Sequence, residues 1–129
     1  MEKVTGIGGV FIKDKDPKAM AAWYEKYLGI NFGENSYMEF KWINSNNPAV
    51  PGSTVFSFFK TDSTYFDPGN QKFMINFRVS NLDLLLETLK EEKIQLVGDP
   101  AQYDYGKFAW IMDPEGNKIE LWEPVDGGF

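Results

Sequence analysis

Residues Asp113 to Glu123 read DPEGNKIELWE, a polar turn followed by a short strand. Proline and glycine close together favour a tight turn, because proline fixes its φ angle and glycine tolerates positive φ. One strand is predicted over Lys118 to Trp122, directly after the turn, and another over Lys107 to Met112, directly before it. We therefore expect a closing β-hairpin at this end of the chain.

Along the whole chain, with the hairpin included, the order of predicted elements occurs twice, and each half reads strand, helix and three strands. The predicted strands are Val4 to Lys13, Ile30 to Gly33, Tyr37 to Ile43, Thr54 to Lys60, Phe73 to Val79, Gln95 to Val97, Lys107 to Met112 and Lys118 to Trp122. The polar connection Thr61 to Gln71 separates the halves. We predict a single domain over residues 1–129, with module one covering about 1–62 and module two about 72–125.

Two helices are predicted from apolar stripes at helical spacing. The first begins after the N-cap Asp16, with Pro17 at its first position, and ends at Gly29. Because such stripes face the core, we expect Trp23 to be buried. The first stripe comprises Met20, Trp23, Tyr24, Tyr27 and Leu28, and the second comprises Leu82, Leu85, Leu86 and Leu89.

The composition excludes several classes of site. The 129 residues contain no cysteine and no histidine, which excludes disulfides, thiolate zinc sites, cysteine nucleophiles and any imidazole chemistry. A net charge of −6 argues against a nucleic-acid partner. No apolar run reaches the roughly 20 residues of a membrane span. The N-terminus lacks the apolar segment of a secretory signal, so we expect a cytoplasmic location.

Three segments resemble the vicinal oxygen chelate superfamily, the group of glyoxalases, bleomycin-resistance proteins and extradiol dioxygenases. They are Val10 to Gly29, Phe77 to Asp83, and the closing hairpin Asp113 to Glu123. The resemblance implies an α+β fold in which two βαβββ modules form an eight-stranded open cleft or barrel-like sheet, with two main helices outside. It also implies a small-molecule ligand and a homodimer.

Metal-dependent members of this superfamily carry ligands, usually His and Glu, near the starts of both first strands and near both last strands. In this chain Gly9 and Met74 occupy the first-strand positions. The last strand of module one offers only Val55, Phe56, Ser57 and Phe58, and Glu120 remains at the fourth position. One carboxylate does not complete a divalent coordination shell. We therefore expect no cofactor, with a weakly held divalent metal as the alternative.

Side-chain alternation along strands indicates which residues face the expected cleft. Glu120 would share a face with Lys118 and Trp122, Asn76 with Met74 and Arg78, and Phe11 with Gly9 and Ile7. Glu120 either pairs with Arg78 across the cleft or contacts the ligand, and it is the candidate catalytic residue. Tyr103 and Tyr105 could cap the cleft. The candidate ligand-binding residues are Phe11, Phe56, Phe58, Met74, Asn76, Arg78, Tyr105, Trp110 and Trp122; a core or interface role remains open for the tryptophans.

Three functional hypotheses follow. The leading one is a metal-free small-molecule-binding protein that sequesters an aromatic or cationic ligand, as bleomycin-resistance proteins do. The alternative is a superfamily enzyme, of lyase, isomerase or dioxygenase-like activity, in which Glu120 acts as a general base and Arg78 or a tyrosine stabilises an oxyanion. The third is a structural module that mainly dimerises.

Overall fold

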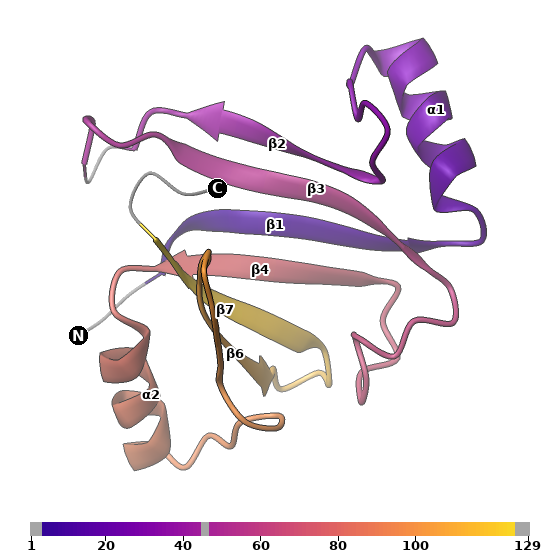
Figure 1. The fold of residues 1–129 in the computed structure, drawn as a ribbon. Helices are drawn as coiled ribbons and strands as arrows, with labels where there is room; N and C mark the ends of the chain where they lie inside the picture. Colours follow the sequence, from indigo (N-terminus) through magenta and orange to yellow (C-terminus); the bar gives the residue numbers. More distant parts are fainter. Residues whose placement is uncertain (1–3, 45–46, 126–129) are drawn as a thin grey trace.

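The computed structural model describes residues 4–44 and 47–125. Within these residues, seven strands form one open mixed sheet accompanied by two helices, which confirms the α+β prediction (Figure 1). The elements are β1 (Val4–Asp14), α1 (Pro17–Leu28), β2 (Tyr37–Trp42), β3 (Gly52–Lys60), β4 (Phe73–Val79), α2 (Leu82–Glu91), β5 (Ala101–Tyr103), β6 (Gly106–Met112) and β7 (Lys118–Pro124). Neither described helix is long and apolar enough to cross a membrane.

The strand count differs from the expected eight at two short segments. Ile30 to Gly33 forms no strand, and Gln95 to Val97 contributes only a single bridge from Leu96 to Ile111. Conversely, β5 forms a hairpin with β6 that the sequence did not predict. Runs of three or four residues carry too little periodicity to separate a strand from a loop.

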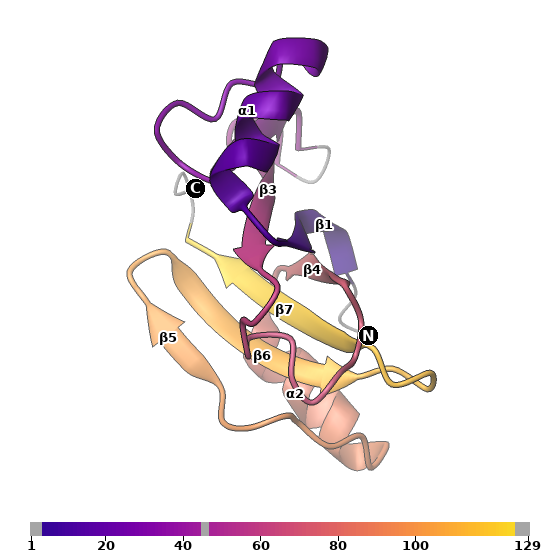
Figure 2. The same ribbon diagram turned by 90° about the vertical axis from the view of Figure 1, so that its right-hand side faces the viewer.

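The two halves of the sheet have the same internal arrangement. The order across the sheet is β2-β3-β1-β4-β7-β6-β5. In the first half β3 runs parallel to β1 and antiparallel to β2, and in the second half β7 runs parallel to β4 and antiparallel to β6. The antiparallel pair β1–β4 joins the halves, and the strands β6 and β7 are turned strongly relative to β3 (Figure 2). The division into two modules at the predicted boundaries stays a prediction.

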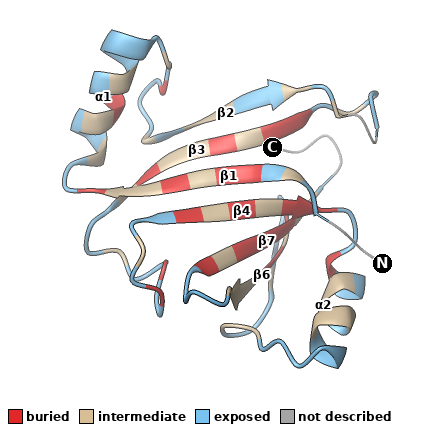
Figure 3. Cartoon of the chain, turned by 180° about the vertical axis from the view of Figure 1, so that it is seen from behind, coloured by how far each residue is buried: buried red, intermediate tan, exposed pale blue. Residues whose placement is uncertain are grey.

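Both helices cover the same face of the sheet. Helix α1 packs on β1 and β3 through Phe58 and its neighbours, and α2 packs on β4, β6 and β7 around Leu82 and Leu121. The cores lie beneath the helices and within the central strands, whereas the outward helix surfaces are exposed (Figure 3). The opposite face of the sheet carries no helix among the described residues, so it is the face on which a pocket can form.

The helix ends follow the sequence, but the burial of α1 does not. Asp16 caps the amide of Ala19, and Gly29 adopts a left-handed φ of 71°, as predicted. Trp23, however, is 51% exposed, which corrects the expectation that it lies in the core. The contact line of α1 runs through Ala21 and Tyr24, and Trp23 therefore lies beside it. Residue spacing locates a stripe but not its centre.

The turn at Asp113 is built by its own side chain. Asp113 Oδ1 accepts hydrogen bonds from the amides of Glu115 and Asn117, both at 2.9 Å. Hydrogen bonds from Asn117 hold the pKa of Asp113 below its usual value. Gly116 supplies the positive φ of 82° that the turn requires. This compact turn fixes the register of β6 against β7 and so places Glu120 in the sheet.

Glycine inside a predicted strand indicates either a bulge or the close approach of another backbone or a ligand, and at Gly8-Gly9 a β-bulge interrupts β1. The register of β1 with β4 shifts between Ile7 and Gly9, which leaves Gly8 between two ladder pairs. A residue inserted at a bulge reverses the alternation of faces. Ile7 therefore does not share a face with Gly9, contrary to the sequence expectation, and Gly8 lines the pocket instead.

Candidate functional site

One row of residues crosses the helix-free face of the sheet. Strand pairing aligns Val55 with Gly9, Gly9 with Asn76, Asn76 with Glu120, and Glu120 with Trp110. Residues opposed in this way point to the same side. The residue on β4 that corresponds to Gly9 is thus Asn76 and not Met74, which corrects the sequence expectation.

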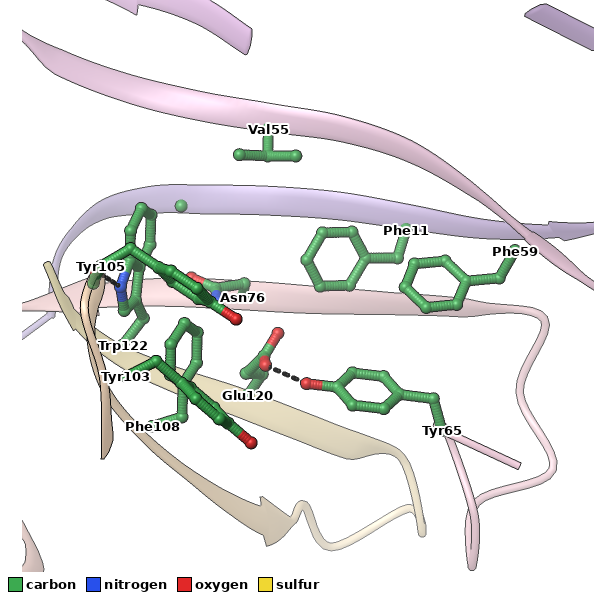
Figure 4. A pocket seen from close by; sticks show the side chains of 11 residues that line it. Phe11, Val55, Phe59, Tyr65, Asn76, Tyr103, Tyr105, Phe108, Glu120 and Trp122 are labelled. Carbon is green, nitrogen blue, oxygen red and sulfur yellow. Dashed lines mark hydrogen bonds between the residues drawn. The ribbon is translucent and has the colours of Figure 1, made fainter. Parts of the chain in front are cut away.

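A pocket of about 310 Å³ lies over this row (Figure 4). Its walls come from β1, β3, β4, β6 and β7, from the connection between β3 and β4, and from the β5–β6 hairpin. Seven of its eleven lining residues are aromatic, and Glu120 is the one charged residue among the eleven. The lining residues are Gly8, Phe11, Val55, Phe59, Tyr65, Asn76, Tyr103, Tyr105, Phe108, Glu120 and Trp122.

Glu120 provides the chemistry of the pocket floor. Its side chain is 2% exposed, and one carboxyl oxygen accepts a hydrogen bond of 2.5 Å from the hydroxyl of Tyr65. The other oxygen points into the pocket (Figure 4). Burial raises the pKa of Glu120, although the polar groups of Tyr65 and Asn76 and the charge of Lys118 oppose the shift. Burial and the adjacent Glu120 charge raise the pKa of Tyr65 as well.

Lys118 holds the segment that carries Tyr65. Its Nζ donates a 2.6 Å hydrogen bond to the backbone oxygen of Tyr65 and lies over the rings of Tyr65 and Trp110. Gln71 Nε2 donates to the Lys118 carbonyl at 2.9 Å, which ties the far end of the same segment to β7. Burial lowers the pKa of Lys118. The β3–β4 connection is thus held against the sheet, with the Tyr65 hydroxyl hydrogen-bonded to Glu120.

The wall opposite Tyr65 is a stack of rings. Phe108 and Trp122 are parallel, with centroids 5.8 Å apart and planes at 8°. Tyr103 and Tyr105 stack on each other at 5.3 Å and project over the pocket from the β5–β6 hairpin (Figure 4). The indole nitrogen of Trp122 donates to the Tyr105 carbonyl at 3.0 Å, which fixes the hairpin tip to β7.

Gly8 and Asn76 meet at the back of the pocket. A Cβ atom at Gly8 would collide with Asn76 Oδ1 and lie 2.9 Å from the Trp122 ring. Asn76 Oδ1 is buried and has no hydrogen-bond partner among the described residues. Because Gly8 has no side chain, the space beside the bulge is available to the Asn76 amide and the Trp122 indole.

Arg78 does not pair with Glu120 in the part of the chain that the structure describes. Its guanidinium lies 5.6 Å from the ring of Trp42 and 5.2 Å from the ring of Trp122, and it donates to the Ser53 carbonyl at 3.3 Å. Burial lowers the pKa of Arg78. Of the two readings that the sequence left open for Glu120, the ion pair is therefore wrong.

The structure brings five of the ten predicted site residues into the pocket: Phe11, Asn76, Tyr105, Glu120 and Trp122. Phe56 and Phe58 lie on the opposite face beneath α1, which corrects their assignment to the cleft. Met74 packs in the core behind Phe11, and Arg78 and Trp110 lie outside the lining. Whether any of these residues binds a ligand stays a prediction.

The sequence analysis missed Tyr65, Phe59 and Phe108 as lining residues. Tyr65 sits in a polar connection, where no periodicity marks its direction. Phe59 and Phe108 lie in predicted strands, and correct alternation from Val55 and from Trp110 would have found both.

The row does not fit a resident divalent metal. Its four positions nearest the pocket supply one carboxylate, one amide, one valine and one glycine. Among the described residues, no group of three or more acidic side chains could hold a metal ion. Divalent ions in proteins need more donors than Glu120 and Asn76 provide.

Comparisons with known proteins agree on the fold. Two methylmalonyl-CoA epimerase structures are similar: that of Streptomyces coelicolor (15% identity, 95% of this chain and 99% of the other, TM-score 0.67) and that of Mycobacterium tuberculosis (22%, 95% and 89%, 0.56). A glyoxalase/bleomycin resistance protein/dioxygenase superfamily member from Vibrio splendidus is 11% identical over 95% of this chain and 99% of its own, with a TM-score of 0.54. No curated protein sequence matches significantly.

The family model named Glyoxalase/Bleomycin resistance protein/Dioxygenase superfamily matches residues 6–121. This range includes the bulge at Gly8, the whole sheet row and Glu120. The chain belongs to the glyoxalase/bleomycin resistance protein/dioxygenase superfamily.

Proposed function

We propose that this protein binds an aromatic small molecule in the Glu120 pocket without a metal ion. The observation that carries the proposal is the lining itself, in which seven of eleven residues are aromatic and surround a single buried carboxyl group. Small-molecule sites in proteins are concave, largely apolar and furnished with a few polar groups. A volume of about 310 Å³ suits a ligand of one or two fused rings.

The aromatic wall supplies the binding energy in this proposal. Tyr103 and Tyr105 are about half exposed and project over the pocket, while the buried, stacked rings of Phe108 and Trp122 form the apolar wall beside them. A planar ligand entering beneath the hairpin would stack on these rings, with a contribution of about 1 kcal/mol for each ring contact beyond area burial.

The test uses a neutral probe, naphthylmethanol, with protein stripped of metal by a chelator. We expect saturable binding, read from the indole N–H signals of Trp110 and Trp122 in nuclear magnetic resonance spectra. The double variant Y103A/Y105A should bind at least about tenfold more weakly, because two stacking partners are lost. The matched control is Y27A, an exposed tyrosine on α1, which should bind as the parent does. Absence of saturable binding by the parent protein would remove the proposal.

Metal independence is tested by adding Mn, Fe, Ni or Zn to the same titration. We expect the dissociation constant of naphthylmethanol to stay unchanged and the purified protein to carry no stoichiometric metal. A stoichiometric metal that E120Q abolishes would overturn this part of the proposal. The homodimer and the cytoplasmic location stay predictions; sedimentation of the purified chain measures the first.

A second candidate function is proton transfer at a carbon next to a carbonyl. The Glu120 carboxyl, with a pKa raised by burial and one oxygen facing the pocket, favours it. Several similar solved structures are methylmalonyl-CoA epimerases. In this reading the carboxylate takes the carbon-bound proton and the electron pair moves onto the carbonyl oxygen. The carboxyl group then exchanges its proton with water and returns a solvent-derived proton to the carbon as the carbonyl re-forms.

Deuterium incorporation into methylmalonyl-CoA in heavy water tests this candidate. Catalysed incorporation that E120Q abolishes and that Y65F shifts in its pH profile would support it, because Tyr65 donates a hydrogen bond to the base. Incorporation no faster than in protein-free buffer would exclude it for this substrate.

A further inference from the structure

We propose that the pocket selects ligands that carry a protonated amine next to the aromatic ring and rejects aromatic carboxylates. This inference rests on the proposed binding function and adds the charge of the ligand. It follows from the distribution of charges around the pocket, which is one-sided.

Glu120 is the one charged side chain among the eleven residues that line the pocket. The two buried cations nearby have other partners. Arg78 lies between Trp42 and Trp122 and donates to a backbone oxygen, and Lys118 donates to the backbone oxygen of Tyr65. Both cations contact lining residues from behind, but neither is among the eleven residues that line the pocket, so the lining itself presents no cation to an anionic ligand.

The carboxyl group keeps acceptor capacity for a ligand, because an ionised carboxylate has about four acceptor sites and the side chains of Tyr65 and Asn76 do not fill them all. Its first oxygen accepts from Tyr65 at 2.5 Å, and its second points into the pocket between Tyr105 and Phe11 (Figure 4). A carboxylate oxygen accepts hydrogen bonds, so a ligand must bring a donor. An ammonium group supplies that donor together with a compensating charge, which matters because the surrounding rings exclude water.

The rings favour the same ligand. A cation over an aromatic face is attracted by the ring quadrupole. Tyr103 and Tyr105 line the pocket together with Glu120, and their rings are about half exposed, so they can receive a cation. An aromatic carboxylate, in contrast, would place its negative charge beside Glu120 in a poorly hydrated space, and a neutral alcohol would gain only one hydrogen bond.

The experiment compares three probes that share one ring system: naphthylmethylamine, naphthylmethanol and naphthoate. At neutral pH we expect the amine to bind at least about tenfold more tightly than the alcohol, and the carboxylate more weakly than both. In E120Q the preference for the amine should shrink to about twofold, because the charge is gone while the shape remains. The matched control is E115Q, an exposed acidic residue of the β6–β7 turn, which should keep the full preference.

A pH titration of the parent protein gives a second readout that does not depend on a variant. As the pH is lowered through the raised pKa of Glu120, the carboxyl group gains a proton while the amine stays protonated. The affinity for the amine should therefore decrease as the pH decreases, and the affinity for the alcohol should stay constant. The groups facing Glu120 are Lys118 on β7, Tyr65 on the β3–β4 connection, Asn76 on β4 and Trp110 on β6. Asn76 and Trp110 do not titrate, burial raises the pKa of Tyr65, and burial lowers the pKa of Lys118.

The outcomes separate the two proposals. Equal binding of all three probes, or tightest binding of the carboxylate, would overturn the selection for amines and leave the aromatic pocket in place. An amine preference that E120Q retains would also overturn it, because the charge would then come from elsewhere. If none of the probes binds, the proposed function fails, and this inference fails with it.

Discussion

The two halves of the sheet share one backbone plan and differ in the chemistry placed on it. Each half has a parallel strand pair flanked by an antiparallel strand. At equivalent points of the pocket row the first half presents Val55 and Gly9, and the second half presents Glu120 and Asn76. The first half therefore supplies space and an apolar wall, while the second supplies every polar side chain of the row. The two halves therefore have the same strand arrangement, but the polar side chains of the pocket row come from the second half alone.

The two helices also differ, in how much of their apolar surface packs against the sheet. Helix α2 buries a single leucine stripe that begins at Leu82, whereas α1 buries Ala21 and Tyr24 and leaves Trp23, Tyr27 and Leu28 largely exposed. The second half is thus closed on its helical face and polar in its pocket. The first half is apolar in its pocket and has aromatic surface on the outside of its helix.

The largest expected loss of stability comes from a residue on the helix-covered face of β3, and it distinguishes that face from the pocket face. Phe58 is 3% exposed and lies among the rings of Tyr24, Phe32 and Phe56 beneath α1. F58A should lower the free energy of unfolding by about 4 kcal/mol, measured by urea denaturation. Naphthylmethanol affinity per folded molecule should not change, because the ring lies on the face away from the pocket.

The neighbouring residue is the matched control for that face. F59A removes a pocket-lining ring, and it should weaken probe binding. A loss of probe affinity in F58A equal to that in F59A would mean that Phe58 reaches the pocket after all.

The next effect tests the apolar side of the row. Val55 is 8% exposed, and V55E would place a second carboxyl group in the pocket, among lining residues of the first half that carry none. We expect a loss of about 3 kcal/mol in unfolding free energy at neutral pH, because a buried carboxylate without a partner is costly. V55Q has the same length without the charge and should lose less. Equal stability of the two variants at neutral pH would show that the first half tolerates a charge.

The elements with strong local signals could be predicted from the sequence, and the pocket only in part. The caps at Asp16 and Gly29, the bulge at Gly8-Gly9 and the hairpin turn at Asp113 each depend on residue types with a specific backbone role. These roles are local, so they can be recognised without knowing the rest of the fold.

The site residues that the sequence predicted wrongly or missed are placed by contacts between segments that are distant in sequence. Tyr65 reaches Glu120 across 55 residues of sequence, and nothing in its polar connection indicates that direction. The sequence places Phe56 and Phe58 in the cleft because an apolar strand does not show which of its two faces is covered by a helix; in the structure both lie beneath α1. One register shift at the bulge moved Ile7 off the pocket face.

A smaller effect is expected on how the free energy of unfolding depends on pH, through Glu120 in the second half of the sheet. Burial raises the folded-state pKa of Glu120 above its ordinary value of 4.5. The neutral form is therefore favoured on folding, and this stability is present below the ordinary pKa and is lost as pH rises through the raised pKa. E120Q cannot lose it, so the stability of E120Q relative to the parent should increase from mildly acidic to neutral pH.

Urea denaturation at both pH values measures this difference. Asp14, whose pKa burial also raises, contributes equally to both proteins and cancels. A constant difference across the range would mean that the carboxyl titrates normally in the folded chain. The V55E variant sharpens the comparison, since its added carboxyl should show the same direction from the other half of the row.

The smallest expected effect lies on the exposed side of α1. Trp23 contacts the rings of Tyr24 and Tyr27 at 5.3 and 5.2 Å but is half exposed, so W23A should cost only about 0.5 kcal/mol in unfolding free energy. L82A on α2 is the contrasting variant, because Leu82 is buried and its loss should cost about 3 kcal/mol.

The expectation for Trp23 holds for a chain that folds alone. A cost above about 2 kcal/mol would mean that something covers this face, and a second copy of the chain would make the cost depend on protein concentration, since association stabilises by mass action. Repeating the denaturation over a hundredfold range of concentration therefore decides between an exposed helix face and a dimer built on it.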